Sequence, residues 1–444
     1  MPAAITGFPF WEAEFDKDVA PVGQPADDII RQIADAQLTD LFVFSHGWNN
    51  DKTTAEKLYS AFFATVRKLI DNPAIKKVGT ARIGVLGIIW PSILWPDEVP
   101  PALKSASPGG GAAGIGAPPQ SVAEIPYKAL KDRVFDESQH TLLDELQGML
   151  KSSAKSDAAL RTFRNKLSEL LAAPAAASGD TDAVERDVIG ATGNKWPDVL
   201  KALAGGERPA AGAGGAAGIG DVFDTMWNGA KGALRIATFW QMKERAGVIG
   251  RTGLGPMISK LAGRSPDTRI HLIGHSFGAR LVSYALAGLA PVPAGQRSPV
   301  KSLLLLQGAF SHFAFADALP FDRARKGDLH GMSTRVDGPL LATFSAFDLA
   351  VGRAYPLGAY ASGQDAAAKA VARWGGMGSD GAQAVKAAGA PLAQTGKPYA
   401  FVAGKWTNLD GNKIIKTGGL PSGAHSDIIH PEIAWALLSA AKLV

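Results

Sequence analysis

The stretch RIHLIGHSFGARLVSYALAGL, residues 269–289, carries the clearest structural signal in the chain. Its apolar run up to Ile273 predicts a short buried strand, and the apolar residues between Phe277 and Leu289 predict a helix. The turn between them, residues 274–278, fits the pattern G-x-S-x-G, in which a serine is held on a tight strand-to-helix turn. Because 51 of the 444 residues are glycine, the pattern needs support from the segments around it.

A strand, a helix and a second strand are predicted upstream of this stretch. Residues 41–45, LFVFS, form a short apolar run that is typical of a buried strand. A helix is expected next, because Thr53 and Glu56 have the spacing of a capping box. Residues 82–90, RIGVLGIIW, predict another buried strand, which Pro91 ends. This order is typical of a parallel sheet.

Strands and helices also alternate in the second half of the chain. Such alternation is typical of an α/β fold with a doubly wound, mostly parallel sheet, and this is the fold class we expect. The predicted strands lie at 300–307, 339–345 and 399–403, and the predicted helices at 239–262, 363–374 and 431–442.

An insertion is expected to interrupt this core. Residues 105–119 and 203–221 are Ala/Gly/Pro-rich tracts that both contain the hexamer GAAGIG, and such tracts bury too little surface to order themselves. Between them, leucines recur at helical spacing in 142–150 and 160–171. A hinged helical insertion could be a lid or cap over a site, or a surface decoration. The predicted regions are the N-terminal part of the core at 1–96, the insertion at 97–235, and the C-terminal part of the core at 236–444.

Composition narrows the classes of protein that fit. The chain has a net charge of +5, from 46 Lys and Arg against 41 Asp and Glu, without a long basic block, so nucleic-acid binding is not expected. It has no cysteine, which excludes disulfides and thiolate chemistry. Residues 1–21 have neither the basic nor the apolar region of a signal peptide, and no apolar run approaches the roughly 20 residues that span a bilayer. We therefore expect a cytoplasmic protein without a transmembrane segment, although export without a signal peptide would fit the same sequence.

Ser276 is the candidate nucleophile. It falls on the predicted turn at the carboxyl end of a strand, where open α/β sheets place their ligands. Gly274 and Gly278 suit this turn, because a Cβ at either position would clash with neighbouring elements. The helix that begins beside the serine directs backbone N–H groups toward an anion formed on an acyl substrate.

A serine nucleophile needs a base, and the base is expected after an acid in the chain order. Four histidines follow Ser276, of which His425 is the best candidate because it lies on a glycine-containing loop before the final helix. His430, at the edge of that helix, is the second choice, and His312 and His330 are the others.

Asp348 is the candidate acid, because it follows a predicted strand closely enough to reach a histidine loop. Asp317 and Asp322 follow the preceding strand at a greater distance, and Asp427 is too close in sequence to His425 to orient it. An ordinary loop or capping role for Asp348 is the alternative.

The site also needs donors for an oxyanion and a pocket for the substrate. The expected donors are the backbone N–H groups of Phe277 and of Trp48, which lies on the loop after an early strand. His46, Asn49 and Trp90 are expected to line the substrate pocket, although a tryptophan at a strand end more often packs in the core.

Taken together, these segments resemble the α/β-hydrolase superfamily, and more narrowly bacterial esterase/lipase-superfamily proteins of uncharacterised function. The resemblance covers about residues 40–95 and 239–444, and the long insertion departs from the compact members. The segments that carry it are FVFSHGWNND, GIIWPS, HLIGHSFGAR, SAFDLAVG and GAHSDIIHPE.

The resemblance and the candidate residues imply a serine hydrolase that cleaves carboxylic esters through an acyl-enzyme on Ser276. Its partner would be a small-molecule or lipid-like acyl ester, and no cofactor or metal is expected. A peptidase, an amidase or a thioesterase could use the same residues. A non-catalytic binding module with this fold is the alternative that is not an enzyme. The presence of all three candidate side chains, Ser276, Asp348 and His425, argues against it.

Overall fold

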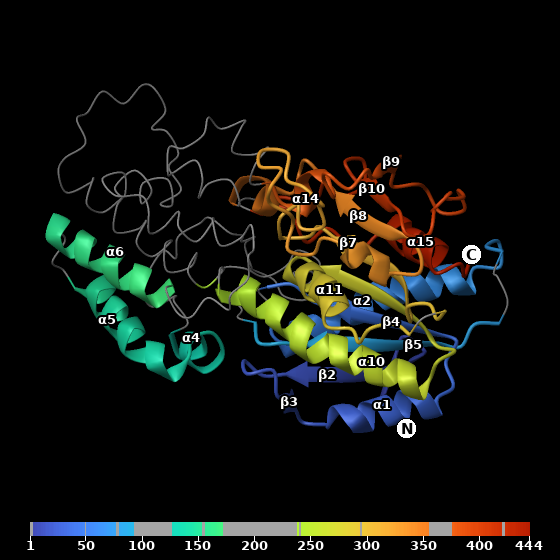
Figure 1. Ribbon diagram of the computed structural model, residues 1–444, viewed down its shortest axis with the longest axis horizontal. Coiled ribbons are helices and arrows are strands. Elements are labelled where there is room, and N and C mark those ends of the chain that lie inside the picture. Colours follow the sequence, from blue (N-terminus) through green and yellow to red (C-terminus); the bar gives the residue numbers. More distant parts are fainter. Residues whose placement is uncertain are drawn as a thin grey trace.

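The computed structural model describes residues 3–48, 50–76, 80–92, 127–152, 156–171, 238, 241–293, 295–354, 375–419 and 422–444, and the structural statements below refer to these residues. Three predictions lie outside them: the helix at 363–374, the two Ala/Gly/Pro-rich tracts, and the place of Asn49 in a pocket. Figure 1 gives the arrangement of the elements.

Ten described strands form one sheet, which confirms the prediction of an α/β fold with a mostly parallel sheet. The strands run parallel to their neighbours except β1 and β3, which pair antiparallel with β2. The order across the sheet is β1-β2-β5-β4-β6-β7-β8-β10-β9, with β3 beside β2. The strands are β1 (Ala3–Ile5), β2 (Phe8–Phe15), β3 (Pro21–Val22), β4 (Asp40–Ser45), β5 (Ile83–Ile89), β6 (Arg269–His275), β7 (Val300–Leu306), β8 (Leu340–Phe344), β9 (Ala388–Pro391) and β10 (Trp406–Asp410).

One predicted strand is wrong. Residues 399–403 lie outside the sheet, and the strand of this region is β10, which pairs with β8 from Trp406 opposite Leu340. In place of strand pairing, Tyr399 and Phe401 stack on each other with ring centroids 4.4 Å apart. The apolar residues of this segment therefore pack on each other locally and do not form the backbone hydrogen bonds of a strand.

Helices form the other regular elements of the described structure. In the core they are α1 (Ala26–Asp35), α2 (Lys52–Asp71), α10 (Gly255–Arg264), α11 (Phe277–Ala287), α14 (Met377–Asp380) and α15 (Pro431–Ala440). In the predicted insertion they are α4 (Tyr127–Arg133), α5 (His140–Lys151) and α6 (Asp157–Leu171). None of the helices in the described part of the chain has the length and apolarity that crossing a membrane requires.

Two helices differ in detail from the expectation. The cap of α2 is Asp51, whose side chain accepts a hydrogen bond from Thr54 N at 2.8 Å, so the helix begins before the predicted capping box. Within the predicted helix at 239–262, residues 241–262 are helical, and they include a π-helical stretch, Ile249–Leu254, before the chain continues as α10. A π-helical stretch inserts a residue into the helical repeat, which side-chain spacing does not reveal.

The sheet is packed on both faces. Phe42 and Phe44 of β4 belong to one hydrophobic cluster, which α2 and α15 complete. Leu41 and Val43 of the same strand belong to another, which α1, α10 and α11 complete. Because successive side chains of a strand point to opposite faces, the two clusters lie on the two sides of the sheet. The β4 strand is therefore central and fully buried, as its continuous apolar run predicts.

The helices α4, α5 and α6 lie at one end of the molecule in Figure 1. Their buried leucines join the cluster that covers the α1 face of the sheet. The guanidinium of Arg245 also ties this end to the core, because it donates a hydrogen bond to the carbonyl oxygen of Val134 at 2.8 Å. The role of the predicted insertion as a lid or a decoration stays a prediction.

The close approach of α11 to β4 depends on Gly278. A Cβ at this position would lie 2.1 Å from the carbonyl oxygen of Ser45, far inside van der Waals contact. We expect Gly278→Ala to lower the free energy of unfolding by about 1–3 kcal/mol, because the helix must move away from the strand. Chemical denaturation measures this change.

Gly263 offers the matched control, since it lies in α10 and a Cβ there would meet no atom within 4 Å. Gly263→Ala should stabilise the protein by up to about 1 kcal/mol, because alanine is the better helix former. Equal effects of the two substitutions would contradict the close packing of α11 on β4.

Candidate active site

Ser276 occupies a strained turn between β6 and α11. Its φ of 58° and ψ of −121° are uncommon for a residue with a side chain. Hydrogen bonds hold the turn on both sides: Ser276 N donates to the oxygen of Leu306 at 3.1 Å, and Ala309 N donates to the oxygen of Ser276 at 3.2 Å. The turn therefore holds the serine backbone in a conformation that an isolated chain would avoid.

A hydrogen-bonded chain of side chains leads away from this serine. The Nε2 atom of His425 lies 2.8 Å from Ser276 Oγ, and its Nδ1 atom lies 2.9 Å from Oδ2 and 3.1 Å from Oδ1 of Asp348. An ionised carboxylate only accepts hydrogen bonds, so the proton of neutral His425 is assigned to Nδ1. Nε2 is then the acceptor for the serine hydroxyl. The side chains of Ser276, His425 and Asp348 are thus brought together, as the sequence predicts.

The two loops that carry the acid and the histidine are bound to each other through their backbones. Asp348 forms a bridge with Gly423, and Ala424 N donates to the oxygen of Phe347 at 2.7 Å. Leu349 N also donates to the oxygen of Ser422 at 3.1 Å. These contacts set the distance between Asp348 and His425, although 77 positions separate them in the sequence.

Burial isolates the three side chains from bulk water. The residues Ser276, His425 and Asp348 are 5%, 8% and 1% exposed. Hydrogen bonds to charged groups are stronger in such surroundings than in water. The arrangement is therefore able to move a proton from the serine hydroxyl to the imidazole while the carboxylate stabilises the resulting charge.

The loop after β4 passes directly beside the serine. A Cβ at Gly47 would lie 2.5 Å from the Cβ of Ser276, so only a glycine allows this approach. The ring of Trp48 packs against that of Phe277, with centroids 6.3 Å apart. The two residues predicted to supply oxyanion donors therefore lie next to each other at the serine turn, and their role stays a prediction.

His46 and Trp90, two of the residues predicted to line the pocket, are buried and bound to each other. Their rings stack at 5.4 Å, and Trp90 Nε1 donates to the oxygen of His46 at 3.0 Å. The Nδ1 atom of His46 donates to the oxygen of Gly47 at 2.8 Å, and its Nε2 atom accepts from Trp90 N at 3.3 Å. In these contacts both residues support the turn at Gly47.

Trp90 also lines a cavity of about 350 Å³. The other walls include Glu14, Asp51, Lys52 and Ser92, so the cavity carries charges of both signs. Ser276 is not among the described residues that line it. The cavity therefore does not support a substrate pocket at Ser276.

Burial lowers the pKa of His46 to about 4, although the hydrogen bond to Gly47 acts in the opposite direction. An unfolded histidine has a pKa near 6.5, so below that pH the unfolded chain binds a proton that the folded chain refuses. The stability contributed by neutral His46 is complete above pH 6.5 and is lost as the pH falls toward 4. This one group should cost about 2 kcal/mol between pH 6.5 and 5.

Denaturant unfolding at a series of pH values measures this effect. His46→Gln, which removes the titrating group, should make the loss of stability toward pH 5 shallower. The quantity to compare is the slope of stability against pH, because a loss of stability that is equal at every pH does not change it. An unchanged slope would contradict a neutral, buried His46.

Two residues at the site were not foreseen in the sequence. No role is predicted for His275 from the sequence, and its Nε2 atom donates to the oxygen of His425 at 3.0 Å. Burial is the main cause that lowers the pKa of His275 to about 3, and this keeps the ring neutral. Gln307 directly follows β7 and donates to Asp348 at 3.0 Å. The signal that could have found Gln307 is a polar residue at the carboxyl end of a central strand.

The second-choice histidine has a different partner. His430 Nε2 lies 2.8 Å from Oδ1 of Asp427, and this hydrogen bond is the main cause that raises the pKa of His430. Asp427 also accepts backbone hydrogen bonds from Lys416 and Thr417 at 2.9 and 2.8 Å. The pair thus fixes the loop before α15.

The remaining candidates also lie in other surroundings. His312 pairs with Asp380 at 2.8 Å, and His330 contacts the oxygen of Gly327. Asp317 is exposed, and Asp322 accepts a backbone hydrogen bond within its own turn.

No cluster of three or more histidine, aspartate or glutamate side chains that could hold a metal ion occurs in the described ranges. Comparison of the chain with protein-family models, with curated proteins and with solved structures gives no match. The case for a function therefore depends on the geometry of the site.

Proposed function

We propose that the protein is a serine hydrolase that cleaves carboxylic esters through an acyl-enzyme on Ser276. The observation that carries the proposal is the unbroken chain of hydrogen bonds from Ser276 Oγ through His425 to Asp348. A serine hydroxyl is a weak nucleophile, and an adjacent base held by an acid is the arrangement that activates it.

In the first half of the proposed reaction, Ser276 Oγ attacks the carbonyl carbon of the ester while its proton moves to Nε2 of His425. The negative charge of Asp348 stabilises the imidazolium that forms. The tetrahedral intermediate then collapses, and the bond between the carbonyl carbon and the alcohol oxygen breaks. His425 returns the proton to that oxygen, so an alcohol leaves and an acyl group stays on Ser276.

In the second half, a water molecule takes the place of the alcohol. It gives a proton to His425 Nε2 and attacks the acyl carbon. The bond to Ser276 Oγ breaks, the proton returns to this oxygen, and a carboxylic acid is released. In each half Nε2 of His425 accepts and returns a proton while Nδ1–H stays on Asp348, which is why one fixed tautomer serves the whole cycle.

The oxyanion of each intermediate is assigned to the backbone N–H groups of Phe277 and Trp48. Phe277 is the first residue of α11, where the positive end of the helix dipole favours an anion. Trp48 is assigned because Gly47 brings its loop against the Cβ of Ser276. His46 and Trp90 would then act through the turn that they support.

We further propose that the sheet is that of the α/β-hydrolase superfamily, doubly wound by helices and interrupted by an insertion at 97–235. The serine at the end of β6, the acid after β8 and the histidine before α15 support this assignment, because they follow the chain order Ser, Asp, His. A cytoplasmic location is proposed with it, since a chain without cysteine suits a reducing compartment.

Esters are proposed over amides by analogy, since ester cleavage is a frequent use of this arrangement. A peptidase, an amidase or a thioesterase would use the same three side chains. Initial rates on p-nitrophenyl esters of increasing acyl length, compared with matched p-nitroanilides and thioesters, distinguish these classes. The proposal expects turnover of at least one ester and slower or absent turnover of the anilides. Absence of turnover with every acyl substrate would contradict it and favour a binding module.

A further inference from the structure

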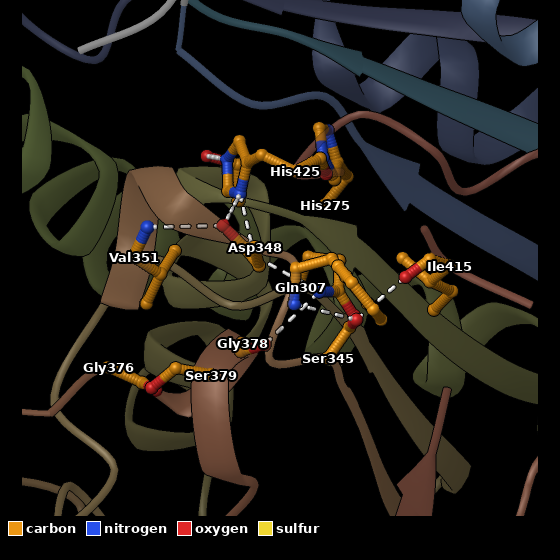
Figure 2. A network of polar contacts seen from close by, with 12 residues as sticks. His275, Gln307, Ser345, Asp348, Val351, Gly376, Gly378, Ser379, Ile415 and His425 are labelled. Atoms are coloured by element: carbon orange, nitrogen blue, oxygen red, sulfur yellow. Dashed lines mark hydrogen bonds and ion pairs between the residues drawn. The ribbon is translucent and has the colours of Figure 1, made fainter. Parts of the chain in front are cut away.

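We infer that Gln307 is a positioning residue, which orients the carboxylate of Asp348 and thereby fixes the tautomer of His425. This inference rests on the proposed function, because it assigns a part in the same reaction to a residue that does not contact the serine. Figure 2 shows the side chain of Gln307 between Asp348 and Gly378.

The position of Gln307 is unusual for a residue that only fills space. It is fully buried and directly follows β7, with a φ of 47° that is rare for a residue with a side chain. Strained backbone of this kind persists where the surrounding structure holds it, and such positions gather at functional sites. Here Gln307 N donates to Thr343 Oγ1 at 3.2 Å, which is one of the contacts that holds it.

The side-chain amide of Gln307 has a single orientation that satisfies its neighbours. Nε2 lies 3.0 Å from Oδ2 of Asp348 and 3.1 Å from the carbonyl oxygen of Gly378, and both of these atoms accept hydrogen bonds. Oε1 lies 2.9 Å from Thr343 Oγ1, which donates. If the amide were rotated by 180°, its oxygen would face Asp348 Oδ2 and the oxygen of Gly378, and neither of these atoms can donate a hydrogen bond. The NH₂ group is therefore fixed toward the carboxylate.

The carboxylate of Asp348 consequently meets a donor on each oxygen besides His425. Oδ2 accepts from Gln307, and Oδ1 accepts from the backbone N–H of Val351 at 3.1 Å. His425 Nδ1 lies within hydrogen-bond distance of both oxygens. With a donor on each oxygen, the carboxylate is held in one orientation and presents only acceptors to the imidazole.

A neutral amide suits this task better than an ion. It donates one hydrogen bond to Asp348 and one to Gly378 without a charge that would offset the charge of Asp348, which the proposed mechanism needs for the imidazolium. Since Gln307 is buried, a cation in its place would carry a desolvation cost, and an anion would repel the carboxylate. The amide is therefore the side chain that orients Asp348 and leaves its charge available to His425.

This polarity makes a specific prediction for Asp348→Asn. The NH₂ group of the asparagine takes the place of either Oδ1 or Oδ2 of Asp348. At Oδ1 it faces the N–H of Val351, and at Oδ2 it faces the NH₂ group of Gln307. At either place the NH₂ group meets a neighbouring donor or donates a hydrogen bond to His425 Nδ1. When Nδ1 accepts this hydrogen bond it carries no proton, so the proton of His425 lies on Nε2. Histidine in that tautomer cannot accept the serine proton, and we expect kcat to fall by about 10⁴-fold.

The double variant Gln307→Glu/Asp348→Asn reverses the polarity of the pair. Glu at 307 accepts from the asparagine NH₂ group, and the asparagine oxygen then faces Val351 N–H and His425 Nδ1–H. His425 recovers the tautomer in which Nε2 is an acceptor. We expect kcat to be at least about tenfold higher in the double variant than in Asp348→Asn, with a similar KM. Recovery stays incomplete, because the negative charge is moved, the oxygen of Gly378 loses its donor, and the asparagine NH₂ group takes the place of Oδ2, which is the carboxylate oxygen nearer to His425 Nδ1.

Two single variants complete the test. Gln307→Met, of similar volume and without donors, should lower kcat by about 10-fold or more and leave KM within about threefold, as expected of a group that acts in the transition state. Gln307→Glu in the wild-type background should lower kcat, because it sets a second carboxylate against Asp348. The same substitution thus has opposite effects in the two backgrounds, which a purely structural role of Gln307 would not produce.

The measurement is the rate of ester hydrolysis by the full chain and each variant, with thermal unfolding followed by circular dichroism to compare only folded proteins. An active, folded Gln307→Met with unchanged kcat would overturn the inference. A folded double variant no more active than Asp348→Asn would overturn it as well. If instead the wild-type protein turns over no acyl substrate, the proposed function fails, so the two failures are distinguishable.

Discussion

Replacing Ser276 with alanine is expected to lower kcat/KM for ester hydrolysis by about 10⁴- to 10⁶-fold. The alanine has no oxygen to form the acyl-enzyme, so only binding and oxyanion stabilisation would remain. The loss should appear in kcat, with KM little changed, because the serine makes its bond to substrate only as the reaction proceeds. Initial rates with the best p-nitrophenyl ester measure both constants.

Ser283 provides the matched control for this change. It is a buried serine of α11 whose hydroxyl donates to the oxygen of Ala279 at 2.7 Å, one helical turn away. Ser283→Ala therefore makes the same chemical change within the helix that follows Ser276 and should keep kcat/KM within about threefold. Similar losses in the two variants would point to disturbance of α11 and would speak against a nucleophilic Ser276.

The second large effect is expected for His425→Ala, which should also lower kcat by about 10⁴- to 10⁶-fold. Among the residues that the structure describes, His425 is the hydrogen-bond partner of Ser276 Oγ, so removing the imidazole removes the group that would take its proton. The wild-type rate should also depend on pH through a group that must be deprotonated to act as the base. The pH profile of kcat/KM and its loss in the variant are the measurements.

His430→Ala distinguishes this assignment from the second-choice histidine. His430 pairs with Asp427 at 2.8 Å, away from the chain of hydrogen bonds at Ser276. The variant should lose stability, since the pair fixes the loop before α15, and should keep kcat within about tenfold. A loss of kcat as large as that of His425→Ala would transfer the role of base to His430.

Much of the sheet could be predicted because its central strands are continuous apolar runs. The segments around Phe42, Val85 and Leu304 are buried on both faces, and such strands have a distinct sequence pattern. The first strands were not foreseen, since β2 mixes apolar residues with Glu12 and Glu14, which face the charged side chain of Lys52. Strand β10 was misplaced because neighbouring aromatic residues that stack on each other gave a stronger apolar signal.

The candidate site divides in a similar way. Ser276, Asp348 and His425 could be predicted because each follows a recognisable local pattern and their chain order is constrained. The position of Gln307 at the end of a strand could be noticed, but its role could not be predicted, because the role depends on the pairing of β7 with β8 and on a contact across 41 positions. The hydrogen bond from His275 to the His425 loop spans 150 positions and depends on loop packing that no local pattern encodes.

Covalent labelling with a fluorophosphonate probe tests the central claim most directly, because the probe reacts with a serine only when the serine is activated as a nucleophile. We expect stoichiometric labelling of the wild-type protein, a modified peptide that contains Ser276, and no labelling of Ser276→Ala. Labelling should persist in Ser283→Ala. A wild-type protein that stays unlabelled, or a Ser276→Ala variant that labels equally, would contradict the account.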